Sequence, residues 1–272
     1  MKTVIHAWTH KFNINNDELS KYNYLNESNF YFGLGDLIRS TIKLHELSKI
    51  MNFNYIVDIQ LHPISQFLKL MPHKYTEYVY MNRDNIQYVC YGEVEDYINK
   101  HNPNDIMLIL TNDFYENTIL TNDCKQFIKH IFTPTNMFND FIQNKLSKIP
   151  FTYFNILHYR LNDNVFLNRL QDKSYDSYVD HIQTHKEHND ILISDTKQLK
   201  QYVFMHNDIF MFHTKICHLG LSVDPDEVRD TLFEFFLLTK ARKIKTFCEI
   251  HSISGFVKWI SKVYDIPVFP LN

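Results

Sequence analysis

Short apolar runs alternate with amphipathic segments along the first half of the chain. The apolar or β-branched runs that predict strands are Val4–Trp8, Asn54–Ile59, Glu77–Met81, Ile86–Tyr91 and Asp105–Leu110. Apolar residues at helical spacing predict helices over Pro63–Leu70, Glu93–Lys100, Asp123–Ile131 and Asn136–Leu146. Strands that alternate with helices in this way are typical of an α/β fold with a parallel sheet.

One further helix is predicted directly after a pair of glycines, Gly33 and Gly35. The segment has an apolar face of Leu37, Leu44, Leu47 and Met51, and a polar face of Arg39, Lys43 and Glu46. Because the chain has only five glycines, we expect this pair where φ is positive or where a ligand approaches the backbone. A glycine turn that feeds a helix N-terminus suits a phosphate or a sugar. A tight turn packed against a neighbour would use the same residues.

The alternation restarts after Ile149-Pro150. Strands are predicted over Thr152–Arg160, Asp190–Asp195, Ile209–His213 and Lys245–Cys248. Helices are predicted over Tyr175–His188, from Asp224 onward, and from the Ser-rich turn at 251–255 through Trp259. We therefore predict two α/β domains, residues 1–147 and residues 148–272. In such folds, ligands bind beyond the carboxyl ends of the strands.

The clearest helix signal is Asp224-Pro225-Asp226-Glu227. Asp224 is expected to be the N-cap, with Pro225 at the first helical position and Glu227 completing a capping box. The predicted buried face consists of Val228, Leu232, Phe235 and Phe236. Asp224 and Asp226 also have the spacing of a metal-binding Asp-x-Asp pair. The helix cap explains that spacing better, and we predict no metal site there.

Composition narrows the class of protein. The 272 residues are 44% hydrophobic, which leaves room for two ordinary domains. A net charge of −3 argues against non-specific nucleic-acid binding, which needs a basic surface. No run approaches the ~20 apolar residues of a membrane span, and the N-terminus has too few apolar residues for a signal peptide. The four cysteines form no CxxC pair, so we expect reduced thiols in a cytoplasmic protein.

Polar residues follow the predicted strand that ends at Arg160. The stretch is His158-Tyr159-Arg160-Leu161-Asn162-Asp163. A guanidinium directly after an apolar strand is suited to bidentate capture of a diphosphate. Asp163 could orient Arg160 or cap the next segment of the chain. An ordinary ion pair at a strand end would produce the same pattern.

Two more polar clusters follow strands. Asp195, in Ser194-Asp195-Thr196, could accept a hydrogen bond from a ribose hydroxyl, or it could cap the helix that starts near Lys197. The Ser-rich turn His251-Ser252-Ile253-Ser254-Gly255-Phe256 leads into a helix. Hydroxyls and backbone amides at such a turn can form an anion-binding nest. A plain helix cap is the alternative.

The order of these clusters resembles the fucosyltransferase superfamily, the group of α1,2- and α1,6-fucosyltransferases, nodulation fucosyltransferases and protein O-fucosyltransferases. His158 to Asp163 is similar to the family's His-x-Arg-x-x-Asp motif, and Ile193 to Thr196 is similar to its second, Asp-containing motif. Phe235 to Ala241, together with Ser252 to Phe256, resembles the third. Gly33 to Asp36 falls where these families place a glycine-rich loop on the acceptor side.

The resemblance implies a GT-B fold, in which two Rossmann-like α/β domains face each other across a cleft. The C-terminal domain would bind a nucleotide-sugar donor, GDP-fucose or a related sugar, and the N-terminal domain would bind a glycan or another hydroxyl acceptor. Transfer would invert the anomeric carbon, with neither a metal nor another cofactor. A guanidinium and a helix N-terminus can together supply the positive charge that a leaving diphosphate needs.

The resemblance also implies roles for single residues. Arg160 would bind the β-phosphate, His158 would contact the nucleotide, and Asp195, Ser252 and Ser254 would hold guanosine and phosphate. The remaining residues expected to bind ligand are Gly33, Gly35, Asp163 and Phe256.

The chain departs from the family at two places. Leu34 stands where some members have a glutamate base, and Ala241-Arg242-Lys243 lacks an Asp that often follows the Ala. Asp36 is therefore our candidate for the base, with His6 or His10 behind it. A base must reach the acceptor hydroxyl.

Two other functions fit the same residues. One keeps the fold and uses a different GDP- or UDP-sugar. The other is a glycosyltransferase-like module without turnover, which binds a glycan or a partner. Separately, His181, His185 and His188 recur at i, i+4 and i+7 and could bind zinc from one helix face. Polar neighbours such as Lys186 favour a solvated face instead, because a structural zinc site takes four well-placed ligands.

Overall fold

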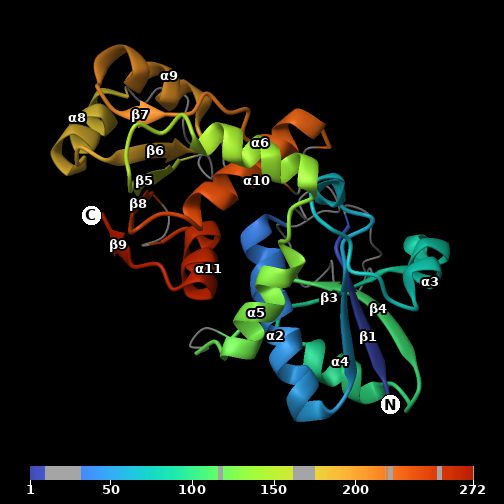
Figure 1. The fold of residues 1–272 in the computed structure, drawn as a ribbon. Coiled ribbons are helices and arrows are strands. Elements are labelled where there is room, and N and C mark those ends of the chain that lie inside the picture. The colour runs from blue at the N-terminus through green and yellow to red at the C-terminus, as the bar shows by residue number, and fades with distance from the viewer. Residues whose placement is uncertain are drawn as a thin grey trace. The chain divides into compact units, whose positions relative to one another are not determined.

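The computed structural model divides the chain into two compact units, Met1–Asn139 with His218–Val223 and Asp140–Cys217 with Asp224–Asn272. The residues that the structure describes are 1–9, 32–115, 119–161, 175–217, 219, 223–249 and 253–271. Each unit is built on one parallel sheet, and helices connect the strands (Figure 1). The predicted α/β class is confirmed.

The first unit has four parallel strands in the order β2-β1-β4-β3. They are β1 (Thr3–Ala7), β2 (Asn54–Asp58), β3 (Gln87–Val89) and β4 (Ile106–Thr111). All residues of the central strand β1 and the last five of the central strand β4 are buried. Helices cover both faces of a parallel sheet, so such strands are continuous apolar runs. This is why their positions could be predicted from the sequence.

The helical segments of the first unit are α2 (Leu34–Met51), η2 (Pro63–Gln66), α3 (Thr76–Met81), η3 (Arg83–Asn85), α4 (Val94–Lys100) and α5 (Asn122–Ile131), and α6 (Asn136–Leu146) follows them. The strand predicted over Glu77–Met81 is wrong, because these residues form most of α3. In this helix only Val79 is buried, whereas Tyr78 and Tyr80 are exposed. Residues such as Tyr and Val favour strands because they pack well on a pleated, half-buried sheet surface. The residues of this segment do not pack on a sheet in that way, so their strand propensity did not decide the structure.

Helix α2 packs its apolar face on the sheet. Leu44 and Leu47 belong to a core cluster with Val4 and Ile109. Lys43, which the helical pattern places on a polar face, is buried. Its Nζ lies 2.9 Å from Glu95 Oε1 and 3.5 Å from the centroid of the Tyr115 ring. The ammonium of this polar-face residue is therefore paired inside the unit.

The second unit has five parallel strands in the order β7-β6-β5-β8-β9. They are β5 (Asn155–Arg160), β6 (Asp190–Ser194), β7 (Phe210–Met211), β8 (Ile244–Cys248) and β9 (Val268–Pro270). Numbered within the unit, the order is 3-2-1-4-5, which is that of doubly wound nucleotide-binding sheets. Strand β9 was not predicted, because it is short and largely exposed at the sheet edge.

The helices of the second unit are α8 (Asp176–His185), α9 (Lys197–His206), α10 (Pro225–Leu238) and α11 (Gly255–Tyr264). The predicted N-cap of α10, Asp224, and Pro225 at the first helical position are confirmed. The Asp224 carboxylate accepts hydrogen bonds from the backbone N–H groups of Asp226 and Glu227 at 2.9 and 3.0 Å. The predicted apolar face of this helix is buried. Helix α8 ends at His185, so His188 lies outside it.

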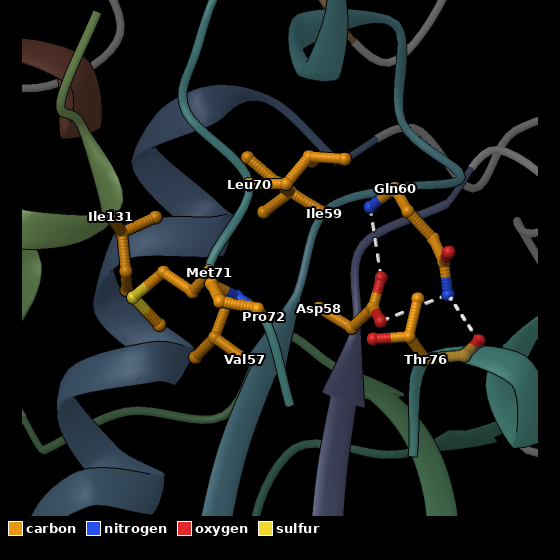
Figure 2. A pocket seen from close by; sticks show the side chains of 9 residues that line it. All are labelled: Val57, Asp58, Ile59, Gln60, Leu70, Met71, Pro72, Thr76 and Ile131. Carbon is orange, nitrogen blue, oxygen red and sulfur yellow. Dashed lines mark hydrogen bonds between the residues drawn. The ribbon is translucent and has the colours of Figure 1, made fainter. Parts of the chain in front are cut away.

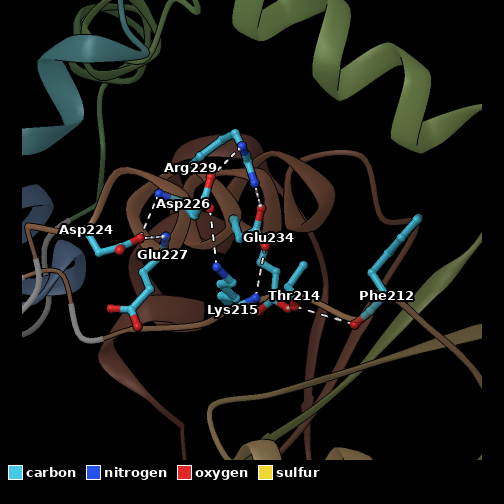
Figure 3. Close-up of polar contacts among 9 residues, drawn as sticks. Phe212, Thr214, Lys215, Asp224, Asp226, Glu227, Arg229 and Glu234 are labelled. Atoms are coloured by element: carbon cyan, nitrogen blue, oxygen red, sulfur yellow. Dashed lines mark hydrogen bonds and ion pairs between the residues drawn. The ribbon is translucent and has the colours of Figure 1, made fainter.

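A buried polar cluster fixes the segment after β7 to α10. The Lys200 ammonium lies 3.1 Å from Glu234 Oε1, and Thr214 Oγ1 lies 2.7 Å from the ammonium and 2.6 Å from the same carboxylate oxygen. Figure 3 shows Thr214 and Glu234 beside a second, more exposed group that includes Lys215 and Asp226. A buried ion pair needs such additional hydrogen bonds to offset desolvation.

None of the helices in the described parts of the chain has the length and the apolar character that crossing a membrane requires.

Candidate active site

The carboxyl ends of β5 and β8 lie at the point of the second sheet where the strand order reverses. In open parallel sheets, ligands bind outside the carboxyl ends of the strands at such a point. Strand β5 ends at Arg160, whose register partner on β8 is Cys248. On the other side of β5, Tyr159 pairs with Ser194, so Asp195 follows the end of β6. The sheet therefore brings two of the predicted polar clusters to neighbouring strand ends, and the Ser-rich turn follows the third strand, β8.

Arg160 and Asp195 form an ion pair across these strand ends. Arg160 Nε lies 3.2 Å from Asp195 Oδ2, and the side chains are 22% and 11% exposed. Asp195 Oδ1 also accepts hydrogen bonds from the Leu161 backbone N–H at 2.9 Å and from Thr196 Oγ1 at 3.3 Å. The carboxylate is thus held from two sides and orients the guanidinium.

The structure bears on two roles that the sequence leaves open, those of Asp195 and Asp163. The N-cap of α9 is Thr196, so Asp195 is not the cap of that helix. Asp195 also orients Arg160, a role that the sequence suggests for Asp163. Asp163 lies outside the described residues. The contacts of Asp195 with a nucleotide stay a prediction.

His158 lies inside the sheet, 3% exposed. Its Nδ1 is 2.9 Å from Thr246 Oγ1, on the neighbouring strand β8. Burial, and then the charge of Arg160, lower the pKa of His158 to about 3. The imidazole is therefore neutral near pH 7, which leaves the guanidinium as the fixed positive charge of this strand. The predicted contact of His158 with the nucleotide stays a prediction.

Helix α11 begins after the end of β8. Ser254 is its N-cap, and the Ser254 hydroxyl accepts a hydrogen bond from the Val257 backbone N–H at 3.3 Å. Among the described residues other than its chain neighbours and its own helix backbone, none has an atom within 4 Å of the position that a Cβ on Gly255 would occupy. Phe256, in the first turn, is half-buried. Ser252 lies outside the described residues, and the ligand contacts of Ser254 and Phe256 stay predictions.

The glycine turn of the first unit does feed a helix. Gly33 is the N-cap of α2, with φ −71° and ψ 166°, so no positive φ requires glycine at this position. Gly35 is buried in the first turn. Asp36 Oδ2 accepts a hydrogen bond from the Gly33 backbone N–H at 3.0 Å, and Asp36 Oδ1 lies 2.8 Å from Arg39 Nη2. The carboxylate thus caps the helix and pairs with an arginine, while its role as the base stays a prediction.

His6, the second candidate for the base, is fully buried in β1. Burial lowers the pKa of His6 to about 3. Its Nδ1 lies 3.2 Å from Thr41 Oγ1 and 3.4 Å from Trp8 Nε1. The imidazole is therefore a neutral core group. His10 lies outside the described residues.

Three potential metal ligands gather elsewhere in the first unit. Within the described residues, this group is His45, Glu46 and Cys124, whose ligand atoms lie within 4.8 Å of one another. Burial raises the pKa of the Cys124 thiol to about 12, and Lys49 Nζ lies 3.9 Å from Glu46 Oε1. A protonated thiol and a nearby ammonium both disfavour a cation. His181, His185 and His188, for which the sequence favours a solvated face over a zinc site, do not form such a group.

A pocket of about 280 Å³ lies in the first unit at the carboxyl end of β2. Its lining residues are Val57, Asp58, Ile59, Gln60, Leu70, Met71, Pro72, Thr76 and Ile131 (Figure 2). Asp58 falls within a strand predicted from the sequence, but no role was predicted for it. A carboxylate at the end of an apolar strand is the same kind of signal as Asp195, and it could have identified this residue.

The fold is similar to solved fucosyltransferase structures. NodZ α-1,6-fucosyltransferase soaked with GDP-fucose matches with a TM-score of 0.52 at 10% identity, over 98% of this chain and 93% of that chain. Fucosyltransferase NodZ from Bradyrhizobium matches with a TM-score of 0.50 at 10% identity, over 95% and 90%. A variant of Arabidopsis thaliana FUT1 in complex with GDP matches with a TM-score of 0.52 at 11% identity, over 100% and 71%.

No protein-family model matches the sequence, and neither does any curated protein. At about 10% identity, the structural likeness concerns the fold. The chain has the GT-B fold of these fucosyltransferases, and the predicted resemblance is confirmed at that level.

Proposed function

We propose that this protein is an inverting fucosyltransferase that takes fucose from GDP-fucose and transfers it to a hydroxyl group of a glycan or another acceptor. The observation that carries the proposal is the position of Arg160, at the carboxyl end of the central strand where the strand order reverses. Asp195 orients it from the next strand. Structures of the same fold in complex with GDP-fucose or GDP support this donor class.

The reaction breaks the bond between the anomeric carbon of fucose and the β-phosphate oxygen, which keeps the electron pair. The acceptor oxygen forms the new bond on the opposite face of the sugar, and its proton goes to a base. GDP leaves with one more negative charge than it carried in the donor. The proposed role of Arg160, together with the backbone N–H groups at the start of α11, is to stabilise that charge. Groups that stabilise a developing oxyanion each contribute about 10²–10³ in rate.

In this proposal the positive charge comes from the protein, so transfer requires neither a metal nor another cofactor. Ser252, Ser254 and His158 would bind the donor. Asp36 would receive the proton of the acceptor hydroxyl. For this it would have to exchange its bond with the Gly33 backbone N–H, or its pair with Arg39, for a bond to the acceptor.

Calorimetric titration with GDP tests the donor site. We expect Arg160→Ala to weaken GDP binding by roughly 10- to 100-fold, because a charge-assisted hydrogen bond contributes about 1.5–3 kcal/mol. Arg242→Ala is the matched control. Arg242 precedes β8 at the amino end of the same sheet, where its guanidinium lies 5.2 Å from the Tyr153 ring. This control should bind GDP as tightly as the unmodified chain.

Two outcomes would contradict the proposal. Binding of UDP or a UDP-sugar in place of GDP would assign a different donor. Binding of no nucleotide at millimolar concentration would indicate a module without turnover.

A further inference from the structure

The pocket at the end of β2 has two chemically different sides. Figure 2 shows the polar residues together on one side and most of the apolar residues on the other, namely Asp58, Gln60 and Thr76 against Val57, Met71, Pro72 and Ile131. The volume of about 280 Å³ is near the lower end of the roughly 300–1,000 Å³ typical of ligand pockets. It has room for one small ring rather than for a long chain.

The carboxylate of Asp58 is the fixed polar group of this pocket. The residue is 4% exposed. Asp58 Oδ1 accepts a hydrogen bond from the Gln60 backbone N–H at 2.8 Å, and Oδ2 accepts one from Gln60 Nε2 at 3.0 Å. His73 Nε2 lies 2.9 Å from the same Oδ2. His73 Nδ1 accepts a hydrogen bond from the Tyr75 backbone N–H, so in the neutral ring Nε2 carries the hydrogen and donates a hydrogen bond to Asp58 Oδ2.

After these contacts, oxygen atoms on the polar side of the pocket can still accept hydrogen bonds from a ligand. Asp58 Oδ1 takes one hydrogen bond from the described residues, although a carboxylate oxygen can accept two. Gln60 Nε2 donates to Asp58 and to the Thr76 backbone carbonyl, so the amide oxygen of Gln60 is turned away from both. Acceptor groups beside an apolar wall select a ligand that donates hydrogen bonds and also has an apolar face.

A pyranose ring has this combination, because its hydroxyl groups donate from the edge while its C–H groups form an apolar face. We propose that this pocket binds one sugar ring of the acceptor, with an acceptor hydroxyl donating to Asp58 and the ring packed against Met71 and Pro72. The inference rests on the proposed function, since it assigns the pocket to the acceptor of that transferase. The pocket lies at the carboxyl end of β2, the edge strand next to β1, and so on the side of the sheet where the carboxyl ends of all four parallel strands are found.

Amide chemical shifts of the ¹⁵N-labelled chain test the assignment. The probes are methyl β-D-glucopyranoside and methyl β-D-galactopyranoside, and tetrahydropyran is the same ring without hydroxyl groups. We expect at least one glycoside to shift the amides of Asp58, Gln60 and Thr76 at millimolar concentration. Tetrahydropyran should bind at least about tenfold more weakly, because it donates no hydrogen bond.

Two variants with matched controls locate the binding. Met71→Trp should fill the pocket and abolish the shifts, whereas Met81→Trp, at an exposed position that does not line the pocket, should leave them unchanged. Asp58→Asn keeps the shape of the side chain but offers a donor in place of an acceptor, and it should weaken glycoside binding by about tenfold. Asp96→Asn, on the exposed side of α4, should have no effect.

A GDP titration of the same samples separates this inference from the proposed function. If GDP binds and neither glycoside shifts the pocket amides, the pocket assignment is wrong and the transferase proposal stands. Equal glycoside binding by Met71→Trp and the unmodified chain would also overturn the assignment. Glycoside binding in a chain that binds no GDP would overturn the acceptor role together with the transferase proposal.

Discussion

Replacing Glu234 by Ala should strongly destabilise the second unit. Lys200 and Glu234 are 5% and 4% exposed, and the ammonium lies 3.1 Å from the carboxylate. The substitution leaves that ammonium buried, with the Thr214 hydroxyl as its remaining partner among the described residues. Breaking a buried ion pair from one side costs about 3–5 kcal/mol. A domain has about 5–15 kcal/mol of stability in total, so the loss would be a large fraction of it.

Two further variants test whether burial of the ion pair causes the expected loss of stability in Glu234→Ala. Lys215→Ala removes an ion pair with Asp226 whose side chains are 66% and 49% exposed, and this should cost less than about 1 kcal/mol. The triple variant Lys200→Met, Thr214→Val, Glu234→Leu removes every polar group of the buried cluster at once. We expect it to recover most of the stability, because apolar residues of similar volume often replace a buried ion pair without loss.

Urea unfolding followed by tryptophan fluorescence measures these changes. The chain has two tryptophans, Trp8 in the first unit and Trp259 in α11 of the second. In a Trp8→Phe background, the signal of Trp259 reports on the second unit alone. A loss below about 1 kcal/mol for Glu234→Ala would refute the reasoning. A triple variant as unstable as the single one would refute it as well.

Three further predictions concern the sites and the pH. Asp195→Asn should leave the fold intact but weaken GDP binding by about tenfold, as measured by calorimetry, because the guanidinium of Arg160 loses the charge that orients it. Burial lowers the pKa of His6 and of His158 to about 3, so these side chains take up protons in the unfolded state at a higher pH than in the folded state. Stability should thus be full above pH ~6.5 and fall below it, by about 2 kcal/mol per histidine at pH 5, in urea unfolding at the two pH values. Asp36→Asn should reduce the turnover of GDP-fucose by about 10²–10⁴ with little loss of stability, and unchanged turnover would limit Asp36 to its role as a helix cap.

Most strands of both sheets could be predicted because a buried strand appears in the sequence as a local run of apolar residues. Ile106–Thr111 lies in a continuous apolar run, and Asn155–Arg160 has an apolar Ile-Leu pair and a tyrosine among its buried residues, as expected for strands that are covered on both faces. Elements with little burial gave no such signal. Strand β9 is exposed at an edge, and α3 buries one residue, so local propensity was all that the sequence offered for them.

Side-chain partners were harder to predict than elements, because a partner depends on the order of the strands and on the packing of the helices. The partner of Lys43 is Glu95, which is 52 positions away on α4. The helical pattern places Lys43 on a polar face, and it is buried because Glu95 and the ring of Tyr115, both distant in the sequence, contact it. The same limit applies to Asp58, since the residues that complete its pocket come from three other segments.

Arg160 and Asp195 show what the sheet adds to a motif. The sequence places an arginine at the end of one strand and an aspartate at the end of another, and each has an ordinary structural explanation. The parallel register pairs Tyr159 with Ser194, which brings the two charged side chains to adjacent strand ends. The same register puts His158 opposite Thr246, inside the sheet and neutral. A fixed cation with an orienting carboxylate therefore stands at the end of the central strand because β5 and β6 are neighbours in the sheet, and an order that placed another strand between them would have separated these groups.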